Sequence, residues 1–150
     1  MDYYIKEYID YNEQEVLSLY KSVGWANYIQ NPEMLKAAYN HSLKIYGAYS
    51  GEELIGIIRV VGDGFSVVFI QDLLVFPEYQ RQGIGEMMMK YAEDLAIKSG
   101  CLQMSLEVRI SNNKAISLYE KRLFKKVAIR NNYYEDNHED AYLMIKELEV

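Results

Sequence analysis

The stretch Gln71-Asp72-Leu73-Leu74-Val75-Phe76-Pro77-Glu78-Tyr79-Gln80-Arg81-Gln82-Gly83-Ile84-Gly85 decides how the rest of the chain is interpreted. The β-branched and aromatic run over residues 67–76 predicts a strand, and Pro77 ends it because proline has no backbone N–H to donate. Apolar residues then recur at helical spacing over residues 84–95, which places Gly83 and Gly85 at the start of a helix. The segment is therefore predicted to be a strand, a tight turn and a helix N-terminus.

The start of that helix has the properties of an anion-binding turn. The first N–H groups of a helix lack intrahelical partners, and its dipole is positive there. Two glycines let a phosphate approach those amides closely, although a glycine pair alone is also common in turns without a ligand. A dinucleotide-binding motif would need a third glycine where Met88 stands, and the Gly-Lys-Ser/Thr of a Walker loop is absent.

Length and composition predict a single globular domain over residues 1–150. Half of the residues are hydrophobic, and no stretch is apolar over the length that a bilayer requires. No charged leader precedes a short apolar core, so we expect a cytoplasmic protein that is not bound to a membrane.

Charge and ligand-type residues argue against two classes of function. The net charge of −6 disfavours nucleic-acid binding, which would need a broad basic surface. Cys101 is the only cysteine, and His41 and His138 are the only histidines, so we expect no metal site. Cys101 opens an apolar run and is expected to be a buried structural thiol.

The pattern of elements alternates strands and helices without repeats or an internal linker. We expect strands at 3–9, 45–49, 54–61, 67–76, 102–110, 124–131 and 141–148, and helices at 12–23, from 32 onward, at 84–99 and at 112–122. The final strand, residues 141–148, is expected to be an exposed edge, which could pair in a homodimer or be a protected edge of the monomer.

A second constellation is Leu106-Glu107-Val108-Arg109-Ile110-Ser111-Asn112-Asn113-Lys114-Ala115-Ile116-Ser117-Leu118-Tyr119-Glu120. Together with Gln80-x-x-Gly83-x-Gly85 after a strand and a proline, it resembles the acetyl-CoA-binding motifs of the GNAT N-acetyltransferase superfamily. The resemblance covers essentially the whole chain. It implies the α/β GNAT fold, with a mixed central sheet of about seven strands and about four helices.

The two halves of the chain resemble different members of that superfamily. The C-terminal half, with residues 130–134 and 139–141, is similar to the ribosomal-protein alanine N-acetyltransferase branch. The N-terminal half, with residues 22–28 and 47–49, is similar to small bacterial GNAT enzymes.

Acetyl-CoA is the implied co-substrate, and the resemblance assigns residues to each part of it. The backbone of residues 73–75 would pair with pantetheine, residues 80–86 would surround the pyrophosphate, and Asn112 would bond the pantetheine arm. The implied cofactor-binding residues are Leu73, Leu74, Val75, Gln80, Arg81, Gln82, Gly83, Ile84, Gly85, Glu86, Asn112, Ala115 and Tyr119.

Direct attack of an amine on a thioester needs a base, an oxyanion contact and a proton donor. The resemblance implies that Glu107 is the base, and an ion pair with Arg109 is the structural alternative. Asp72, an acid in an apolar strand, is the rival base. Tyr119 would protonate the departing sulfur, or else be a core aromatic, and a backbone N–H near Val75 would bind the oxyanion.

Two residues depart from the family pattern. Glu86 puts an acid in the phosphate turn, and we expect its side chain to point into solvent. Leu123 replaces the usual glycine after the tyrosine-bearing helix, so that turn must close without glycine.

The acceptor side is the least defined part of the sequence. Trp25 and Tyr28 could line a pocket that binds a cationic amine with their aromatic faces, or be ordinary aromatics. We expect an acetyl-CoA-dependent N-acetyltransferase acting on a primary amine, either a small molecule or a protein N-terminus. The alternative is a regulatory module that binds acyl-CoA without turnover.

Overall fold

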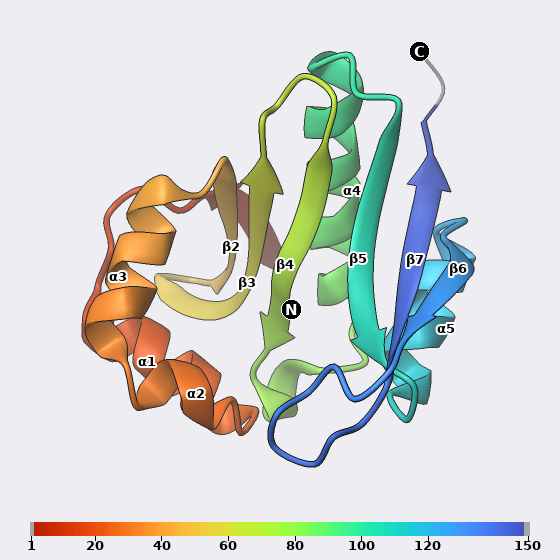
Figure 1. Ribbon diagram of the computed structural model, residues 1–150. Helices are drawn as coiled ribbons and strands as arrows, with labels where there is room; N and C mark the ends of the chain where they lie inside the picture. The colour runs from red at the N-terminus through yellow and green to blue at the C-terminus, as the bar shows by residue number, and fades with distance from the viewer. Residues whose placement is uncertain (1, 149–150) are drawn as a thin grey trace.

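A mixed sheet of seven strands forms the centre of the protein, with the order β1-β2-β3-β4-β5-β7-β6 (Figure 1). The computed structural model describes residues 2–148. Only β4 and β5 run parallel, whereas all other neighbours are antiparallel. The strands are β1 (Tyr3–Glu7), β2 (Lys44–Ser50), β3 (Glu53–Gly62), β4 (Val68–Val75), β5 (Gln103–Arg109), β6 (Lys125–Arg130) and β7 (Ala141–Glu147). The predicted α/β class and mixed sheet are confirmed.

Helices cover both faces of this sheet. They are α1 (Glu13–Ser22), α2 (Ala26–Ile29), α3 (Pro32–His41), α4 (Ile84–Lys98) and α5 (Asn113–Lys121), with a 3-10 turn η1 (Pro77–Tyr79). The side chain of Asn12 caps α1 by accepting a hydrogen bond from the Glu15 amide at 3.0 Å. The short α2 was not predicted, because a helix of four residues leaves no periodic pattern in the sequence.

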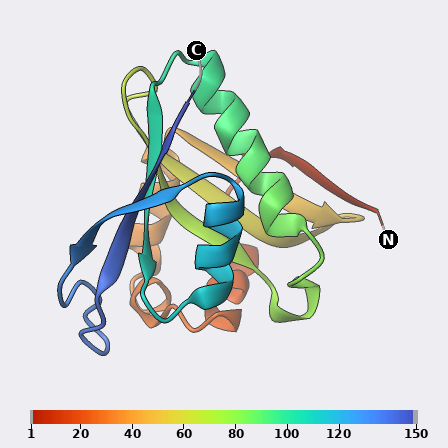
Figure 2. The ribbon, with the colours of Figure 1, turned by 90° about the vertical axis from the view of Figure 1, so that its right-hand side faces the viewer.

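Two hydrophobic cores lie on opposite faces of the sheet. α4 and α5 lie on one face of the sheet, as the ribbon in Figure 2 shows from the side. The core on this face includes Met88, Met104 and Phe124. α1 and α3 pack on the other face around Leu19 and Leu35. The cleft described below lies where elements of both layers meet the end of β4.

A β-bulge in the middle of β4 changes which face its side chains reach. The register shifts opposite Arg59 and Val60, which leaves Gln71 as the extra residue. Val68 and Ile70 therefore belong to the core under α4, whereas Asp72 and Leu74 face the α1–α3 side. The bulge thus turns the one acid of this strand toward the helices of the N-terminal half.

β4 and β5 pair only over a short length and then diverge toward their C-terminal ends (Figure 1). The register joins residues 68–70 of β4 to residues 104–106 of β5. The amide of Phe76 donates to the carbonyl of Ile55 at 2.9 Å, so alternation directs the N–H and C=O of Val75 away from β3. Within the described residues, the backbone of Val75 therefore faces a side where β4 has no strand partner.

The prediction that the final strand is an exposed edge is wrong. β7 pairs with β5 on one side and with β6 on the other, because the chain returns from β6 through a hairpin and enters between them. The edges of the sheet are β1 and β6.

A buried cluster of charges ties α4 to the end of α5 and to β7. Glu93 on α4 accepts hydrogen bonds from Arg122 at 2.7 and 3.0 Å and from Lys146 at 2.7 Å. Burial alone would raise the pKa of Glu93, but the hydrogen bonds from Arg122 and Lys146 lower it. The carboxylate therefore stays charged and fixes the two helices relative to one another.

The turn after α5 closes without glycine, as predicted, but in a strained conformation. Leu123 has a φ of 72° and its side chain is largely exposed. The amide of Phe124 nevertheless reaches the carbonyl of Tyr119 at 2.9 Å, a bond that is typical of a helix C-terminus with a left-handed residue.

We predict that Leu123→Gly stabilises the protein by about 1 kcal/mol, because glycine adopts the left-handed region without the clash of a Cβ atom. Urea denaturation followed by circular dichroism measures the change. Leu123→Ala keeps the Cβ atom and is the control, with an expected change within about 0.5 kcal/mol. Equal midpoints for the glycine variant and the wild type would contradict the strain.

Candidate functional site

A cleft of about 810 Å³ is bounded by the end of β4, the turn into α4, and α5. Residues from the loop after α1 complete its lining. The structure brings together the predicted cofactor-binding residues except Gln82, namely Leu73, Leu74, Val75, Gln80, Arg81, Gly83, Ile84, Gly85, Glu86, Asn112, Ala115 and Tyr119.

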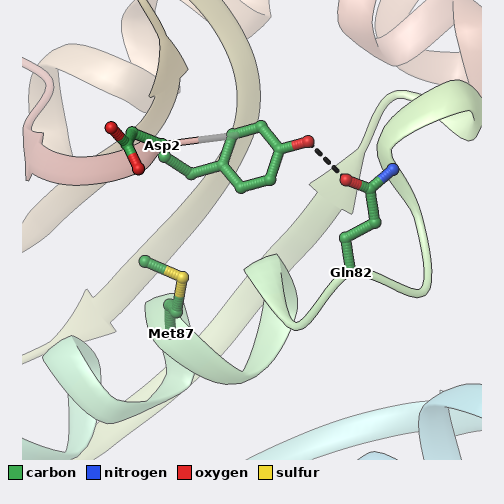
Figure 3. A pocket seen from close by; sticks show the side chains of 4 residues that line it. Asp2, Gln82 and Met87 are labelled. Carbon is green, nitrogen blue, oxygen red and sulfur yellow. Dashed lines mark hydrogen bonds between the residues drawn. The ribbon is translucent and has the colours of Figure 1, made fainter.

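The side chain of Gln82 turns away from this cleft. Its amide donates to the carbonyl of Glu78 at 3.3 Å, and its oxygen accepts a hydrogen bond from the hydroxyl of Tyr3. Gln82 lines a second cavity of about 510 Å³ together with Asp2 and Met87 (Figure 3). Only the main chain of Gln82 remains as a candidate contact in the cleft.

The two glycines of the turn have different structural roles. Gly83 is the N-cap of α4 with a φ of 83°, and a Cβ atom there would meet nothing within 4 Å, so the backbone angle is what requires glycine. A Cβ atom on Gly85 would lie 3.3 Å from Leu118 Cδ2, so this glycine allows α4 to approach α5. No side chain caps the α4 N-terminus, and its first amides are left for a ligand.

Charges around the turn are partly neutralised. Glu86 was expected to point into solvent, but its carboxylate is partly buried and lies 2.9 Å from Lys121 Nζ. The hydrogen bond from Lys121 lowers the pKa of Glu86, which therefore stays negative but paired. Arg81 and Lys114 also line the cleft and supply positive charge beside the uncapped amides.

The end of β4 is fixed by a side chain from the turn. Gln80 Nε2 donates to the carbonyl of Val75 at 3.0 Å. This bond occupies the carbonyl that faces the gap between the diverging strands. The N–H of Val75 points to the same side, as the alternation of strand hydrogen bonds requires.

α5 places Asn112 and Tyr119 on the cleft. Asn112 is the N-cap, and its side-chain oxygen accepts from the Ala115 amide at 3.2 Å, which leaves its amide nitrogen to donate to a ligand. Tyr119 is buried against Phe124 and lines the cleft. Burial raises the pKa of the Tyr119 phenol above its ordinary value, so it keeps its proton at neutral pH.

Glu107 lies on the face of β5 opposite the buried Leu106 and Val108, outside the lining of the cleft. Its ion-pair partner is Arg130, whose Nε lies 2.8 Å from Glu107 Oε2, at an angle that makes no hydrogen bond. Oε2 is buried without a hydrogen-bond donor among the described residues. Oε2 therefore has only the charge of Arg130 beside it, and the Arg130 side chain is 52% exposed.

The predicted alternative for Glu107, an ion pair with Arg109, is wrong. Arg109 instead binds the loop between β6 and β7, with Asp136 at 2.9 Å and Glu139 at 3.3 Å. Its guanidinium also lies 3.9 Å from the ring centre of Tyr134. Because Arg109 forms ion pairs with Asp136 and Glu139, it is not the partner of Glu107. Glu107 pairs instead with Arg130, in a geometry that makes no hydrogen bond.

Asp72 lies away from the cleft, in a shell of donors. Arg59 Nε and the hydroxyl of Tyr20 each donate to its Oδ2 at 2.7 Å, and the hydroxyl of Tyr28 donates to Oδ1 at 3.3 Å. Asp72 is 1% exposed, which leaves no room for a reacting amine. Sequence reasoning missed Arg59, although it is the one charged residue of an otherwise apolar run over residues 54–61.

The two predicted acceptor residues lie next to each other, but only one reaches the cleft. Trp25 lines it, whereas Tyr28 stacks behind Trp25 with ring centres 6.0 Å apart.

Membrane-spanning helices and metal-ligand clusters were also sought among residues 2–148. None of the helices there has both the length and the apolar character that a membrane span requires. In the same residues, no group of three or more His, Cys, Asp or Glu side chains is placed to hold a metal ion.

Comparisons with known proteins point to one family. Residues 5–124 match the Acetyltransferase (GNAT) family. A candidate ribosomal protein bS18-alanine N-acetyltransferase of Bacillus subtilis is 37% identical over 112 residues, which are 75% of this chain and 72% of that one. The ribosomal protein bS18-alanine N-acetyltransferase of Escherichia coli is 44% identical over 75 residues, so the match spans about half of each chain.

The fold is also shared with a solved structure. The crystal structure of the ribosomal-protein-S18-alanine N-acetyltransferase from Escherichia coli superposes with a TM-score of 0.85 and 24% identity. The superposition covers 99% of this chain and 96% of that one. The likeness in fold therefore extends over nearly the whole chain, whereas the sequence match to the Escherichia coli enzyme covers about half of it.

Proposed function

Because the chain belongs to the GNAT acetyltransferase family, we propose that it uses acetyl-CoA to acetylate a primary amine. The observation that carries this proposal is the cleft itself. Its lining includes both an uncapped helix N-terminus and the buried, protonated phenol of Tyr119. A thioester that is attached to a pyrophosphate needs a site that binds the phosphates and a group that gives a proton to the departing sulfur.

The residues of the cleft fit the parts of acetyl-CoA. The first amides of α4 would bind the pyrophosphate, with Arg81 and Lys114 adding positive charge. The pantetheine arm would enter between the diverging strands and pair with the backbone of β4 up to Val75, as an added strand does at a sheet edge. Asn112 would donate to the arm through its free amide nitrogen.

The transfer itself needs three groups of this chain. Bound acetyl-CoA supplies an acetyl thioester, whose carbon–sulfur bond breaks as the bond between nitrogen and the acetyl carbon forms. The N–H of Val75 would hold the carbonyl oxygen as it becomes negative. Glu107 would take the proton from the amine, directly or through water, and Tyr119 would give its proton to the departing sulfur. The side chain of Glu107 is 11% exposed and has Arg130 as its ion-pair partner, whereas the 1% exposed Asp72 is enclosed by three donors, and this difference supports Glu107 as the base.

The acceptor that we propose first is a protein N-terminus. Both relatives described above carry the name of an enzyme that acetylates the alanine terminus of ribosomal protein bS18. Trp25 would form the wall against which the acceptor lies. Small-molecule amines are the second acceptor class.

The proposal is tested by incubating the protein with acetyl-CoA and a peptide that carries the N-terminal sequence of bS18. We expect release of the coenzyme A thiol and a peptide that is heavier by one acetyl group in mass spectrometry. A panel of small amines is assayed in parallel. Tight binding of acetyl-CoA without thiol release from any acceptor would contradict the enzyme and leave a regulatory acyl-CoA-binding module.

Replacing Tyr119 tests the proton donor. We predict that Tyr119→Phe lowers kcat by about 100-fold and changes acetyl-CoA affinity by less than about threefold. Because burial raises the pKa of Tyr119 from the ordinary 10.0, the phenol stays protonated and the kcat of the wild type is not expected to fall as the pH approaches 10. A decline of kcat centred on that pH would show that Tyr119 ionises like an exposed tyrosine.

Replacing Glu107 tests the base. Glu107→Gln keeps the size of the side chain but removes its basicity, so we predict a loss of about 100-fold in kcat with acetyl-CoA binding retained. Glu120→Gln on the exposed face of α5 is the matched control and is expected to leave kcat unchanged. If Glu107→Gln retains full activity, another group accepts the amine proton.

A further inference from the structure

Trp25 lines the cleft from the start of α2, a helix that is too short to be stable by itself. α2 has only four residues, none of them buried, and no side chain caps its N-terminus. A helix this short is not stable alone in water, so its position is set by contacts with the rest of the protein. Trp25 is the N-cap residue of α2, and it is the only tryptophan of the chain.

The loop that leads into α2 already has a defined geometry. Gly24 has a φ of 77°, and the amides of Gly24 and Trp25 bond back to the carbonyls of Lys21 and Tyr20 at 3.1 and 3.2 Å. This is the Schellman arrangement at the end of α1. It brings Trp25 to the cleft, but neither of its two bonds reaches the far end of α2, which needs further support.

That support comes from the hydroxyl of Tyr28. The hydroxyl donates to Asp72 Oδ1 at 3.3 Å and accepts from the NH2 group of Arg59 at 3.3 Å. Arg59 Nε closes the ring by donating to Asp72 Oδ2 at 2.7 Å. Tyr28 is thus bonded as donor and as acceptor to one ion pair, and its ring stacks on Trp25 with an interplanar angle of 30°.

The ion pair is a rigid anchor for this contact. Arg59 and Asp72 lie on the central strands β3 and β4, and their side chains are 6% and 1% exposed. Tyr20 bonds the same carboxylate, and Tyr39 bonds Tyr20 at 2.9 Å. A buried pair with its lone pairs satisfied holds one geometry, because any displacement would leave a charge without a partner.

We infer that Arg59 and Asp72 are positioning residues that hold Trp25, through the hydroxyl of Tyr28, as the acceptor-side wall of the cleft. The role of Trp25 toward the acceptor rests on the proposed function, whereas its attachment to the ion pair does not. Asp72 on this view takes no proton during transfer. The bulge in β4 is what brings it opposite Arg59 and beneath α2.

The attachment is tested with Tyr28→Phe, which removes one hydroxyl and keeps the ring that packs on Trp25. The readout is fluorescence of the unliganded protein, in which every tryptophan photon comes from Trp25. We expect quenching by acrylamide to rise by about twofold and the anisotropy of Trp25 to fall, because α2 loses its bonds to the sheet. Tyr39→Phe removes a buried hydroxyl of the same cluster that touches neither Tyr28 nor Trp25, and should change neither signal.

Kinetics with the best acceptor from the peptide and amine panels give the second readout. Tyr28→Phe is expected to raise the KM for the acceptor by about fivefold, with the KM for acetyl-CoA unchanged. A fluorescence change without this KM effect would overturn the role in acceptor binding. If no acceptor is found, the proposed function fails, but the fluorescence of Trp25 still shows whether Tyr28 attaches α2 to the Arg59–Asp72 pair. The two proposals can therefore fail independently.

A double variant tests the ion pair itself. Removing one partner would leave a buried charge and risk unfolding, whereas Arg59→Met with Asp72→Leu replaces both charges with apolar groups of similar size. We expect this double variant to fold and to show the increased quenching of Tyr28→Phe. Wild-type quenching in both Tyr28→Phe and the double variant would overturn the inference. The same double variant tests Asp72 as the base. If it keeps wild-type activity, Asp72 does not accept the amine proton. If its kcat falls by about 100-fold while the KM for the acceptor is unchanged, Asp72 and not Glu107 is the base.

Discussion

The short parallel pairing between β4 and β5 is the constraint on which the site depends. Three residues of each strand are joined, and beyond them the backbone of β4 loses its neighbour on that side. A buried strand normally satisfies its amides with another strand, so the gap must be filled by something that offers hydrogen bonds. The turn at Gly83 and the N-terminus of α5 line the same cleft as the end of β4, which supports the proposed binding site there.

The two faces of the sheet use different interactions for different purposes. The face under α4 and α5 is an apolar core, closed at its rim by the buried Glu93 and its partly exposed partners Arg122 and Lys146. The face under α1–α3 contains a polar centre around Arg59 and Asp72. An ion pair of this kind adds little net stability compared with apolar side chains, but it fixes geometry. Its place beneath the element that carries Trp25 is consistent with that use.

Local patterns predicted the parts of the structure that local physics determines. The glycine turn, the strand before it and the capped helix at Asn112 depend on neighbouring residues, and the structure has them as expected. The position of β7, the partner of Glu107 and the pairing of Arg59 with Asp72 depend on which strands become neighbours. A strand pattern shows which residues share a face, but it contains nothing about the strand that lies beside it. The face that Asp72 reaches also depends on a bulge in β4, which leaves no sequence signal of its own.

The fastening of α4 to α5 gives the cleft a fixed length. Gly85 allows the helices to touch at Leu118, and Glu93 joins them again through Arg122, so neither helix can slide along the other. The glycine turn lies at the start of α4 and Tyr119 lies near the end of α5. If the cleft binds acetyl-CoA as proposed, the separation between the turn and the phenol does not adjust to the ligand. A molecule with the same phosphates and a shorter arm would then bind at the turn without bringing its thioester to the phenol.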